Sequence, residues 1–277
     1  MTRVLGCWRY PVKSAAAQVV DTLQLTGDGV VGDRVWAAIA HDATVVSAKH
    51  PRKGGRLLEV RTSYDDASGV VSVTVPGQAT RCAGDEQLDV ALSDWLGRSV
   101  ALTDVVPEGL RLHRLWPHEQ GMLPDWVADA GAGDEVLTAV SGAARGRFVD
   151  YGPLHLVTTG QLTRLENELG HPVHPVRFRP NLIIDLPDDP RFGQRLRIGD
   201  VELTIDQPTS RCVIPSLPQA AVADTDSDIG ADSDILKVLA RHHREPVGAR
   251  GKAAVFGCYA NVLRPGTVNR GDEVSFA

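Results

Sequence analysis

The chain has 277 residues and a formal net charge of -6, with 43% hydrophobic and 23% charged residues. These proportions are ordinary for a globular protein, and the length allows one domain or two. The acidic balance excludes a general nucleic-acid binder, which needs an excess of Lys and Arg to neutralise phosphates, so any anion site must be a local basic cluster.

The first hundred residues predict short strands followed by one helix. Strands are expected over residues 19–25, 35–39, 57–61 and 70–75, the last two as a hairpin across an Asp/Ser/Gly loop. Leu88, Leu92 and Leu96 recur at the spacing of one helix face, which predicts a helix over residues 85–96. Gly97 is positioned to end it.

The remaining chain predicts an irregular segment and then mixed elements. Residues 107–146 are rich in Gly, Pro, Asp and Trp, which is typical of a linker or active-site flap. Helices are expected over 161–169, ended by Gly170, and over 234–242. Strands are expected over 154–158, 181–185 and 253–263, with a Gly-Asp hairpin over 195–203 and a last hairpin over 266–274 that would close a barrel.

Targeting and cysteine patterns favour a cytoplasmic protein without membrane contact. The N-terminus lacks the apolar core of a signal peptide, and no stretch approaches the ~18 apolar residues of a membrane helix. The four cysteines, Cys7, Cys82, Cys212 and Cys258, are scattered without a CxxC pair. A disulfide framework, a structural zinc site and an iron–sulfur site are therefore not expected.

The segment Pro208–Pro215 carries the strongest chemical signal. Cys212 follows Ser210 and Arg211 directly after a strand-like run. A thiolate is a soft metal ligand, and a neighbouring guanidinium favours the charged form of the thiol. Cys212 is therefore a candidate catalytic residue and metal ligand, with Ser210 and Arg211 as candidate ligand-binding neighbours. The alternative is a buried, inert cysteine.

A second cluster, Arg177-Phe178-Arg179-Pro180-Asn181, offers fixed donors suited to a phosphorylated ligand. Pro180 favours an extended Arg179, and alternation would then place Arg177 and Arg179 on one face with Phe178 in the core. Asn181 adds donor and acceptor capacity for the edge of a heterocycle. Solvated surface arginines are the alternative.

Two further motifs offer anion-binding groups. The run Tyr10–Ser14, followed by Asp33-Arg34, supplies the Lys13 ammonium, the Ser14 hydroxyl and the Arg34 guanidinium for a phosphate, unless these are surface and turn residues. Thr158 and Thr159 stand at a strand-to-helix junction, where Thr159 is the expected N-cap. Free N–H groups of that first helical turn can bind an anion, and capping alone is the alternative.

Together, these motifs resemble in spacing and order the MOSC family (molybdenum cofactor sulfurase C-terminal domain) with its N-terminal MOSC-associated β-barrel domain. The chain is similar to bacterial two-part MOSC proteins and to the mitochondrial amidoxime-reducing component. The resemblance implies an α+β, mainly β fold, with a closed, mostly antiparallel β-barrel and an additional α/β subdomain. It further implies an N-terminal MOSC-associated domain over residues 1–105, a linker or flap over 106–139 and a MOSC domain over 140–277.

The resemblance also implies a cofactor and a reaction. The cofactor would be molybdenum–pyranopterin (Mo-molybdopterin), with no haem, flavin or iron–sulfur cluster in this chain. Its phosphate would contact Lys13, Ser14, Arg34, Thr158, Thr159, Arg179 and Asn181, and Cys212 would ligate molybdenum. The site would reduce N-hydroxylated compounds such as amidoximes and hydroxylamines. Because no ferredoxin domain follows Ala277, a separate ferredoxin- or flavin-type protein is expected to supply electrons.

Three other functions are open on these residues. The chain could be a sulfur transferase carrying a persulfide on Cys212, although the pyridoxal-phosphate domain of full-length sulfurases is absent from this sequence. It could be a carrier that stores the cofactor and hands it on. It could also be a family member without molybdenum that uses the same cleft for another ligand. Phe192–Arg195 and Ile214–Pro218 depart from the family pattern.

Overall fold

The computed structural model describes residues 2–106, 108–127, 129–139, 146–223, 225 and 227–277. Four β-sheets dominate these residues. The α-helices are α1 (Pro51–Gly54), α2 (Glu86–Leu96), α3 (Thr159–Leu169) and α4 (Asp234–His242). Within the described ranges, none of the helices has the length and apolarity needed to cross a membrane.

The largest sheet has nine strands and brings the two ends of the chain together. Its order is β2 (Gln18–Val20), β1 (Val4–Arg9), β14 (Leu182–Ile184), β13 (Leu154–Thr158), β18 (Lys252–Arg264), β16 (Val201–Ser210), β15 (Arg195–Ile198) and β20 (Val274–Phe276), with β17 (Arg244–Pro246) also paired to β18. β13 and β14 are parallel, and the other neighbours are antiparallel. The β15–β16 hairpin turns at Gly199, as the sequence predicts.

The predicted closed barrel is wrong for the residues that the structure describes. The nine-stranded sheet has β2 at one edge and β20 at the other, and no ladder joins them. The expected last hairpin does not form, because β19 (Gly266–Asn269) pairs with β3 (Thr22–Thr26) whereas β20 pairs with β15. The broader prediction of an α+β, mainly β fold is confirmed.

A five-stranded sheet corrects the prediction of an irregular segment over residues 107–146. Its order is β10 (Val100–Thr103), β5 (Ala37–Ala40), β6 (Thr44–Val45), β11 (Arg111–Leu115) and β12 (Glu135–Ala139). β11 pairs in parallel with β6 and antiparallel with β12. Leu112 of β11 is buried with Val45 and Phe148, so local hydrophobic contacts hold this hairpin on the sheet.

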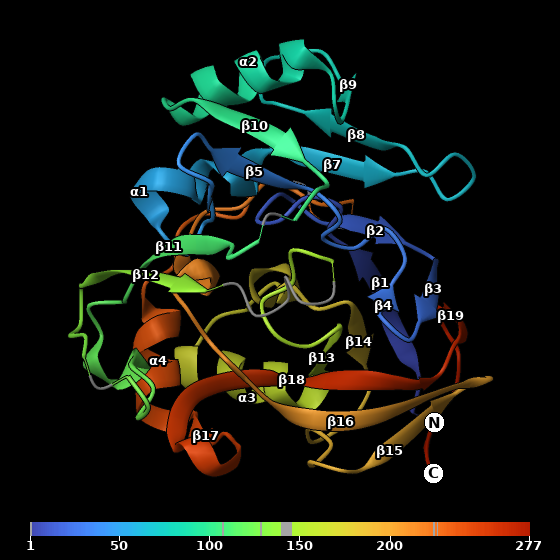
Figure 1. The fold of residues 1–277 in the computed structure, drawn as a ribbon. Helices are drawn as coiled ribbons and strands as arrows, with labels where there is room; N and C mark the ends of the chain where they lie inside the picture. Colours follow the sequence, from blue (N-terminus) through green and yellow to red (C-terminus); the bar gives the residue numbers. More distant parts are fainter. Residues whose placement is uncertain (1, 107, 128, 140–145, 224, 226) are drawn as a thin grey trace.

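Two three-stranded sheets complete the described strands. One contains β19, β3 and β4 (Gly29–Val30), and the other β7 (Arg61–Tyr64), β8 (Val71–Thr74) and β9 (Arg81–Cys82). The predicted hairpin is present as β7 and β8, but it starts later than expected. Leu57 and Leu58 lie instead in a 3₁₀ helix, η1 (Gly55–Glu59), where both side chains are buried. Figure 1 shows β5, β7, β8, β10 and α2 above the largest sheet, with β3, β4 and β19 at the right beside β1.

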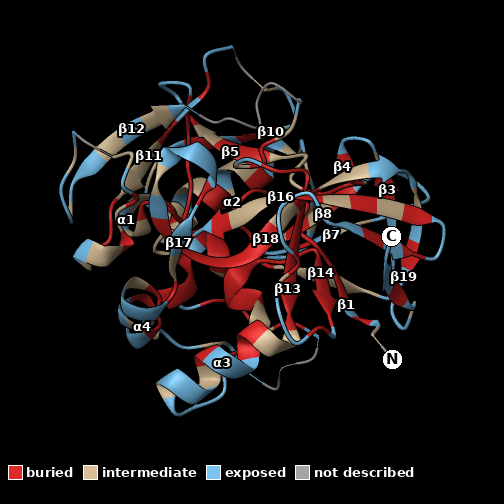
Figure 2. Cartoon of the chain, turned by 90° about the horizontal axis from the view of Figure 1, so that it is seen from below, coloured by how far each residue is buried: buried red, intermediate tan, exposed pale blue. Residues whose placement is uncertain are grey.

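The predicted helices form where their apolar stripes meet a sheet. In α2, Asp85 caps the N-terminus by accepting from Gln87 N, and Gly97 ends the helix at φ 66°. Leu88 and Leu92 pack in a core shared with β8 and β10. The outer faces of α3 and α4 are exposed, as the pale blue ribbon of Figure 2 shows.

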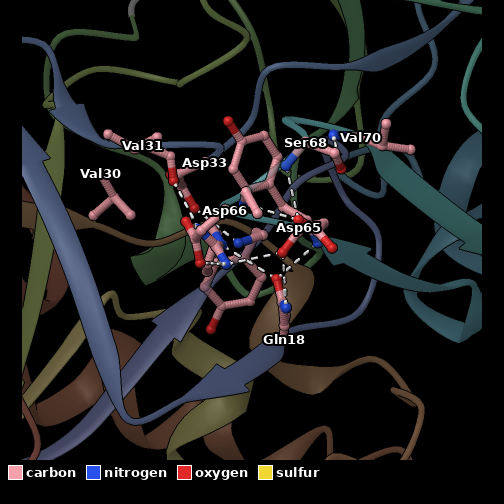
Figure 3. Close-up of polar contacts among 12 residues, drawn as sticks. Gln18, Val30, Val31, Asp33, Asp65, Asp66, Ser68 and Val70 are labelled. Atoms are coloured by element: carbon pink, nitrogen blue, oxygen red, sulfur yellow. Dashed lines mark hydrogen bonds and ion pairs between the residues drawn. The ribbon is translucent and has the colours of Figure 1, made fainter.

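Arg9 anchors the end of β1, directly before the segment that enters the candidate site. Its side chain is only 1% exposed, and all five of its N–H donors are used. Two bonds form a bidentate pair with Asp66 at 2.7 and 3.0 Å, and the others reach Gln18 Oε1, Val31 O and Tyr64 O (Figure 3). This network fixes β1 against the β7–β8 loop.

Candidate functional site

A cleft of about 250 Å³ lies where loops of the first hundred residues meet β11, β13, β16 and β18. Seven cationic side chains line it, and Asp150 is the one carboxylate among the described lining residues. The cations are Lys13, Arg34, Lys49, Arg114, Arg179, Arg211 and Arg250. On a chain of net charge -6, this concentration of positive charge marks an anion-binding site.

The structure gathers most of the sequence-predicted site residues around this cleft, although they come from three separate motifs. Those that line it are Lys13, Ser14, Arg34, Arg179, Asn181, Ser210, Arg211 and Cys212. Thr158, Thr159 and Arg177 do not line it.

The two threonines are committed to local structure. Thr158, not Thr159, caps α3, since its hydroxyl accepts from Gln161 N at 3.3 Å. The same hydroxyl donates to Asp189 Oδ1 at 2.6 Å, and Thr159 Oγ1 donates to Asp185 Oδ1 at 3.0 Å. The predicted anion site at this helix start is therefore not part of the cleft, because both hydroxyls hold the 185–189 loop.

Arg177 and Arg179 turn in different directions, which corrects the prediction of an extended segment. Pro175–Phe178 is a 3₁₀ helix, η4, and Arg179 follows it in the left-handed conformation at φ 56°, ψ 48°. Arg177 Nη1 donates to Pro215 O and Nη2 to Gly230 O, so its guanidinium fixes neighbouring loops. Phe178 is buried as predicted and stacks on Phe256.

Backbone strain is concentrated at the cleft. Among the described residues, four that are not glycine have positive φ, and three of them line the cleft: Ser14 (64°), Arg34 (49°) and Arg179 (56°). Left-handed φ is uncommon for residues with a Cβ and costs on the order of 1–3 kcal/mol. Such strain gathers at functional sites, where a side chain must be aimed at a ligand.

Arg34 and Arg179 stack on the same tyrosine. Their guanidinium carbons lie 4.8 and 4.2 Å from the centre of the Tyr10 ring. Arg34 also pairs with Asp33, whereas Arg179 Nη1 donates to Ala15 O at 2.7 Å. Burial, together with the charge of Arg34, lowers the pKa of Arg179 to about 10. An anion bound here would relieve both the desolvation and the repulsion.

Lys13, Lys49 and Asp150 form a second charged group in the cleft. Each ammonium lies 2.8 Å from Asp150 Oδ1, and Lys13 also donates to Phe148 O at 2.7 Å. Burial lowers the pKa of both lysines, that of Lys49 to about 8. Burial alone would raise the pKa of Asp150, but the two ammonium groups hold it well below its usual range.

Several buried donors in the cleft have no hydrogen-bond partner among the described residues. They are Arg114 Nε, Trp116 Nε1, Arg179 Nη2, Thr209 Oγ1 and Arg211 Nε. An unpaired buried donor costs about 1–3 kcal/mol, so folded proteins rarely leave several in one place. Because all five belong to lining residues, they indicate a polar ligand rich in acceptor oxygens.

Of the four cysteines, Cys212 is the one that lines the cleft. It is half-buried and packs beside Leu58 and Ile214. Cys7 and Cys258 belong to the core of the large sheet, and burial raises the pKa of Cys7 to about 12. Cys82 is exposed on β9.

Asn181 lines the cleft but its amide is already used. Its Nδ2 donates to Trp8 O and Asp33 Oδ1, both at 3.2 Å, and its Oδ1 accepts from His155 N at 3.1 Å. The structure therefore gives Asn181 a role in holding β1, β13 and Asp33 together. Contact with a ligand would have to use the remaining lone pair of its oxygen.

Sequence reasoning missed several lining residues. The motifs do not include Lys49, Arg114 or Asp150. A local excess of basic residues at Lys49–Lys53 is the one sequence signal for Lys49. Arg250 was also missed. Its guanidinium lies 4.8 Å from the ring centre of Trp126 and donates to Gln207 Oε1 at 2.9 Å, so it forms one wall of the cleft.

Comparisons with known proteins agree with this arrangement. The family model described as "MOSC domain" matches residues 144–275, and the model described as "MOSC N-terminal beta barrel domain" matches residues 1–101. The chain belongs to the MOSC family. Both matched segments contribute to the cleft, since Lys13 and Arg34 fall in the first and Arg179 and Cys212 in the second.

Curated relatives extend over almost the whole MOSC chain. It is 25% identical over 292 residues to the mitochondrial amidoxime-reducing component 1 of Homo sapiens, covering 98% of this chain and 82% of that protein. It is 28% identical over 238 residues to the molybdenum cofactor sulfurase of Drosophila mojavensis, covering 76% of this chain but 27% of that protein. Among solved structures, the YUAD protein from Bacillus subtilis is similar at a TM-score of 0.42 and 14% identity, covering 99% of this chain and 94% of that chain.

Proposed function

We propose that this chain is an oxidoreductase that holds a molybdenum–pyranopterin cofactor in the cationic cleft and reduces N-hydroxylated compounds. A separate ferredoxin- or flavin-type protein would supply the electrons. We also propose the division into an N-terminal domain over residues 1–105, a connecting segment over 106–139 and a second domain over 140–277. The first domain would contribute Lys13, Ser14 and Arg34 to the site.

The unpaired donors of the cleft carry the proposal. Arg179 Nη2, Arg211 Nε and Thr209 Oγ1 are buried donors without a partner in the described part of the chain. A phosphate monoester presents several acceptor oxygens and about two negative charges, which such donors can share. The residues present therefore fit the phosphate end of a pyranopterin cofactor. Arg34 and Lys13 would add further positive charge.

Cys212 would hold the metal end of the cofactor. A cysteine binds a metal as the thiolate, and soft thiolates suit metals with sulfur-rich coordination. Cys212 lines the cleft together with Arg211 and Lys49, so a thiolate there would have cationic neighbours. When bound, the cofactor would supply two-electron redox chemistry at molybdenum.

Lys49 can supply a proton for the reduction. Converting R–NHOH to R–NH₂ and water takes up two electrons and two protons, so the departing oxygen needs a proton donor. Burial lowers the pKa of Lys49 to about 8, close to the working range of a general acid. Asp150 orients Nζ of Lys49 at 2.8 Å. We therefore assign proton donation to Lys49 and positioning to Asp150.

The names of the relatives favour a reductase over the alternatives. The relatives named amidoxime-reducing component are matched over 81–82% of their length, whereas the molybdenum cofactor sulfurase is matched over 27%. The sulfurase match supports a second candidate, a transferase carrying persulfide sulfur on Cys212. Both candidate functions use the Cys212 thiol. In the reductase it would bind molybdenum, and in the transferase it would carry persulfide sulfur.

Metal and pterin analysis tests the proposal. The chain is expressed in a host that makes the cofactor, with molybdate supplied, and its molybdenum, pterin and cyanide-releasable sulfur are measured. We expect molybdenum and pterin in equal amounts and reduction of benzamidoxime when an electron-donor protein is added. NADH alone should give little activity. Protein that lacks molybdenum and pterin would contradict the proposal, and cyanide-releasable sulfur without molybdenum would establish the transferase.

A further inference from the structure

A second cavity, of about 660 Å³, adjoins the cationic cleft at the β16–β18 ladder. In this ladder, Gln207 pairs with Tyr259 and Pro208 with Cys258. Gln207 lines both cavities, whereas Tyr259 lines the cleft alone and Pro208 and Cys258 line the second cavity alone. The two cavities therefore meet at Gln207 and otherwise have different linings.

The floor of the second cavity is apolar. Ile205, Pro208, Val255 and Cys258 form part of its lining. Phe192 also belongs to the lining, yet its side chain is 79% exposed. A phenyl ring held in water beside an apolar floor is available to cover a ligand. The volume falls within the range of roughly 300–1,000 Å³ that is typical of small-molecule sites.

Negatively charged residues outnumber positively charged ones in the lining of this cavity, whereas the lining of the cleft is mostly positive. Four carboxylates line it, Asp188, Asp189, Asp206 and Glu245, against the two guanidinium groups of Arg164 and Arg191. Arg164 is already paired with Asp188 at 2.8 Å. The cavity therefore carries an excess of negative charge over an apolar floor.

Asp189 is a half-buried carboxylate of this cavity. It comes from the 187–192 loop and accepts a hydrogen bond from Thr158 at 2.6 Å, which fixes Oδ1 at the start of α3. Burial raises its pKa to about 6, and the nearby Glu245 and Asp188 contribute to the increase. A cation in the cavity would be attracted to Asp189 and Glu245 together.

We propose that this second cavity binds a small organic cation with a flat apolar body, of the aryl-alkylammonium class. The apolar body would lie on Val255 and Pro208 beneath Phe192, and the ammonium would face Asp189 and Glu245. The site shares Gln207 with the cofactor cleft, but its other lining residues differ and it does not depend on the redox activity. An anionic ligand is disfavoured by the carboxylates, which would repel it.

Calorimetric titration with benzylamine, and with benzyl alcohol as its neutral counterpart, tests the site. The two probes share the phenyl ring and differ in charge, so the carboxylates should distinguish them. We expect benzylamine to bind at least tenfold more tightly at pH 7.5. Glu245→Gln should weaken benzylamine binding about threefold and Phe192→Ala should weaken both probes. The double variant Asp189→Asn/Glu245→Gln should weaken benzylamine at least tenfold without affecting benzyl alcohol.

Asp94→Asn on α2 is the matched control, because it removes a carboxylate that is exposed and far from this lining. It should leave the affinity unchanged. Equal binding of the two probes, or equal affinity in Glu245→Gln and the Asp94→Asn control, would overturn the proposal. If Asp189→Asn fails to fold because Thr158 loses its partner, the comparison of probes and Glu245→Gln still decide the question.

Discussion

Lys13 and Asp150, which stand 137 residues apart in the sequence, form an ion pair of 2.8 Å in the cationic cleft. Lys49 shares the same carboxylate oxygen at 2.8 Å. Two ammonium groups on one oxygen leave a net positive charge facing the cleft. This pair links a motif near the N-terminus to the start of the segment that matches the MOSC domain model, residues 144–275. The group of two lysines and Asp150 contributes to the positive potential of the cleft.

Arg179→Lys should reduce cofactor retention although it keeps the positive charge. Arg179 uses one nitrogen for Ala15 O and leaves Nη2 for a ligand, and a lysine ammonium cannot cover both positions. We expect at least a tenfold loss of pterin per protein, measured after purification. Arg195→Lys, which changes an exposed arginine of β15, is the control. Equal pterin in Arg179→Lys and wild type would make Arg179 a structural residue.

Anion binding should weaken as pH rises from 7 to 9. Burial lowers the pKa of Lys49 to about 8, so its ammonium loses a proton in this range. Sulfate, whose charge is constant there, should bind roughly fivefold more weakly at pH 9, which corresponds to about 1 kcal/mol of Coulomb energy. Lys49→Gln should bind less tightly at pH 7 and show a flatter profile. A wild-type profile independent of pH would contradict this assignment.

When no anion is bound, the titration of Lys49 should make the protein more stable as the pH rises. This is the opposite of the trend predicted for anion binding. The pKa of Lys49 is lowered on folding, so between about pH 8 and pH 10.5 the unfolded chain binds more protons than the folded chain. The free energy of unfolding that this group contributes should therefore rise with pH across that window. Urea unfolding at pH 8 and pH 10 gives the change in the free energy of unfolding with pH for wild type and for Lys49→Gln. The difference between these two changes is the contribution of Lys49.

Arg9→Lys should destabilise the fold by about 2 kcal/mol, since several hydrogen bonds of a buried charge are lost. The five bonds of Arg9 in Figure 3 include a bidentate pair that lysine cannot reproduce. The change in urea midpoint at constant slope measures the loss. Arg195→Lys should stay within about 0.5 kcal/mol, because its ion pair with Glu202 is exposed. Similar values for the two variants would show that the Arg9 network contributes little.

Gly160→Ala should destabilise the junction of β13 and α3. A Cβ at this position would overlap the carbonyl of Pro187, and Gly160 N donates to Leu186 O at 2.9 Å. The loop or the helix must therefore shift, at a cost of about 1–3 kcal/mol. Gly27→Ala is the control, because a Cβ there would meet nothing within 4 Å. Thermal unfolding compares the two, and equal melting temperatures would rule out close packing at Gly160.

Local patterns predicted the regular elements well. The Leu88 and Leu92 stripe with Gly97 gave α2 because helix periodicity and a left-handed C-cap are both local properties. Pairing partners were less predictable. Residues 266–274 were predicted to form a hairpin, but β19 and β20 join different sheets, since pairing is decided by distant strands such as β3 and β15.

The candidate site was partly predictable for the same reason. Motifs identified Arg34, Arg179 and Cys212, which the fold brings to one cleft. The extended conformation expected before Pro180 failed, because Arg179 N closes a 3₁₀ turn on Val176 O and its side chain is held by Ala15 O. The basic run at Lys49–Lys53 does not identify Lys49 as a site residue, because tertiary packing brings it to Asp150.

The substitution Cys212→Ser tests the central claim most directly. Wild-type and variant protein, purified from the same cofactor-producing host, are compared for molybdenum, pterin and donor-dependent reduction of benzamidoxime. If Cys212 ligates molybdenum, the variant should lose the activity and retain pterin, because the proposed phosphate contacts are made by other residues, Arg34, Arg179 and Arg211. Full activity of Cys212→Ser with molybdenum still bound would contradict the assignment.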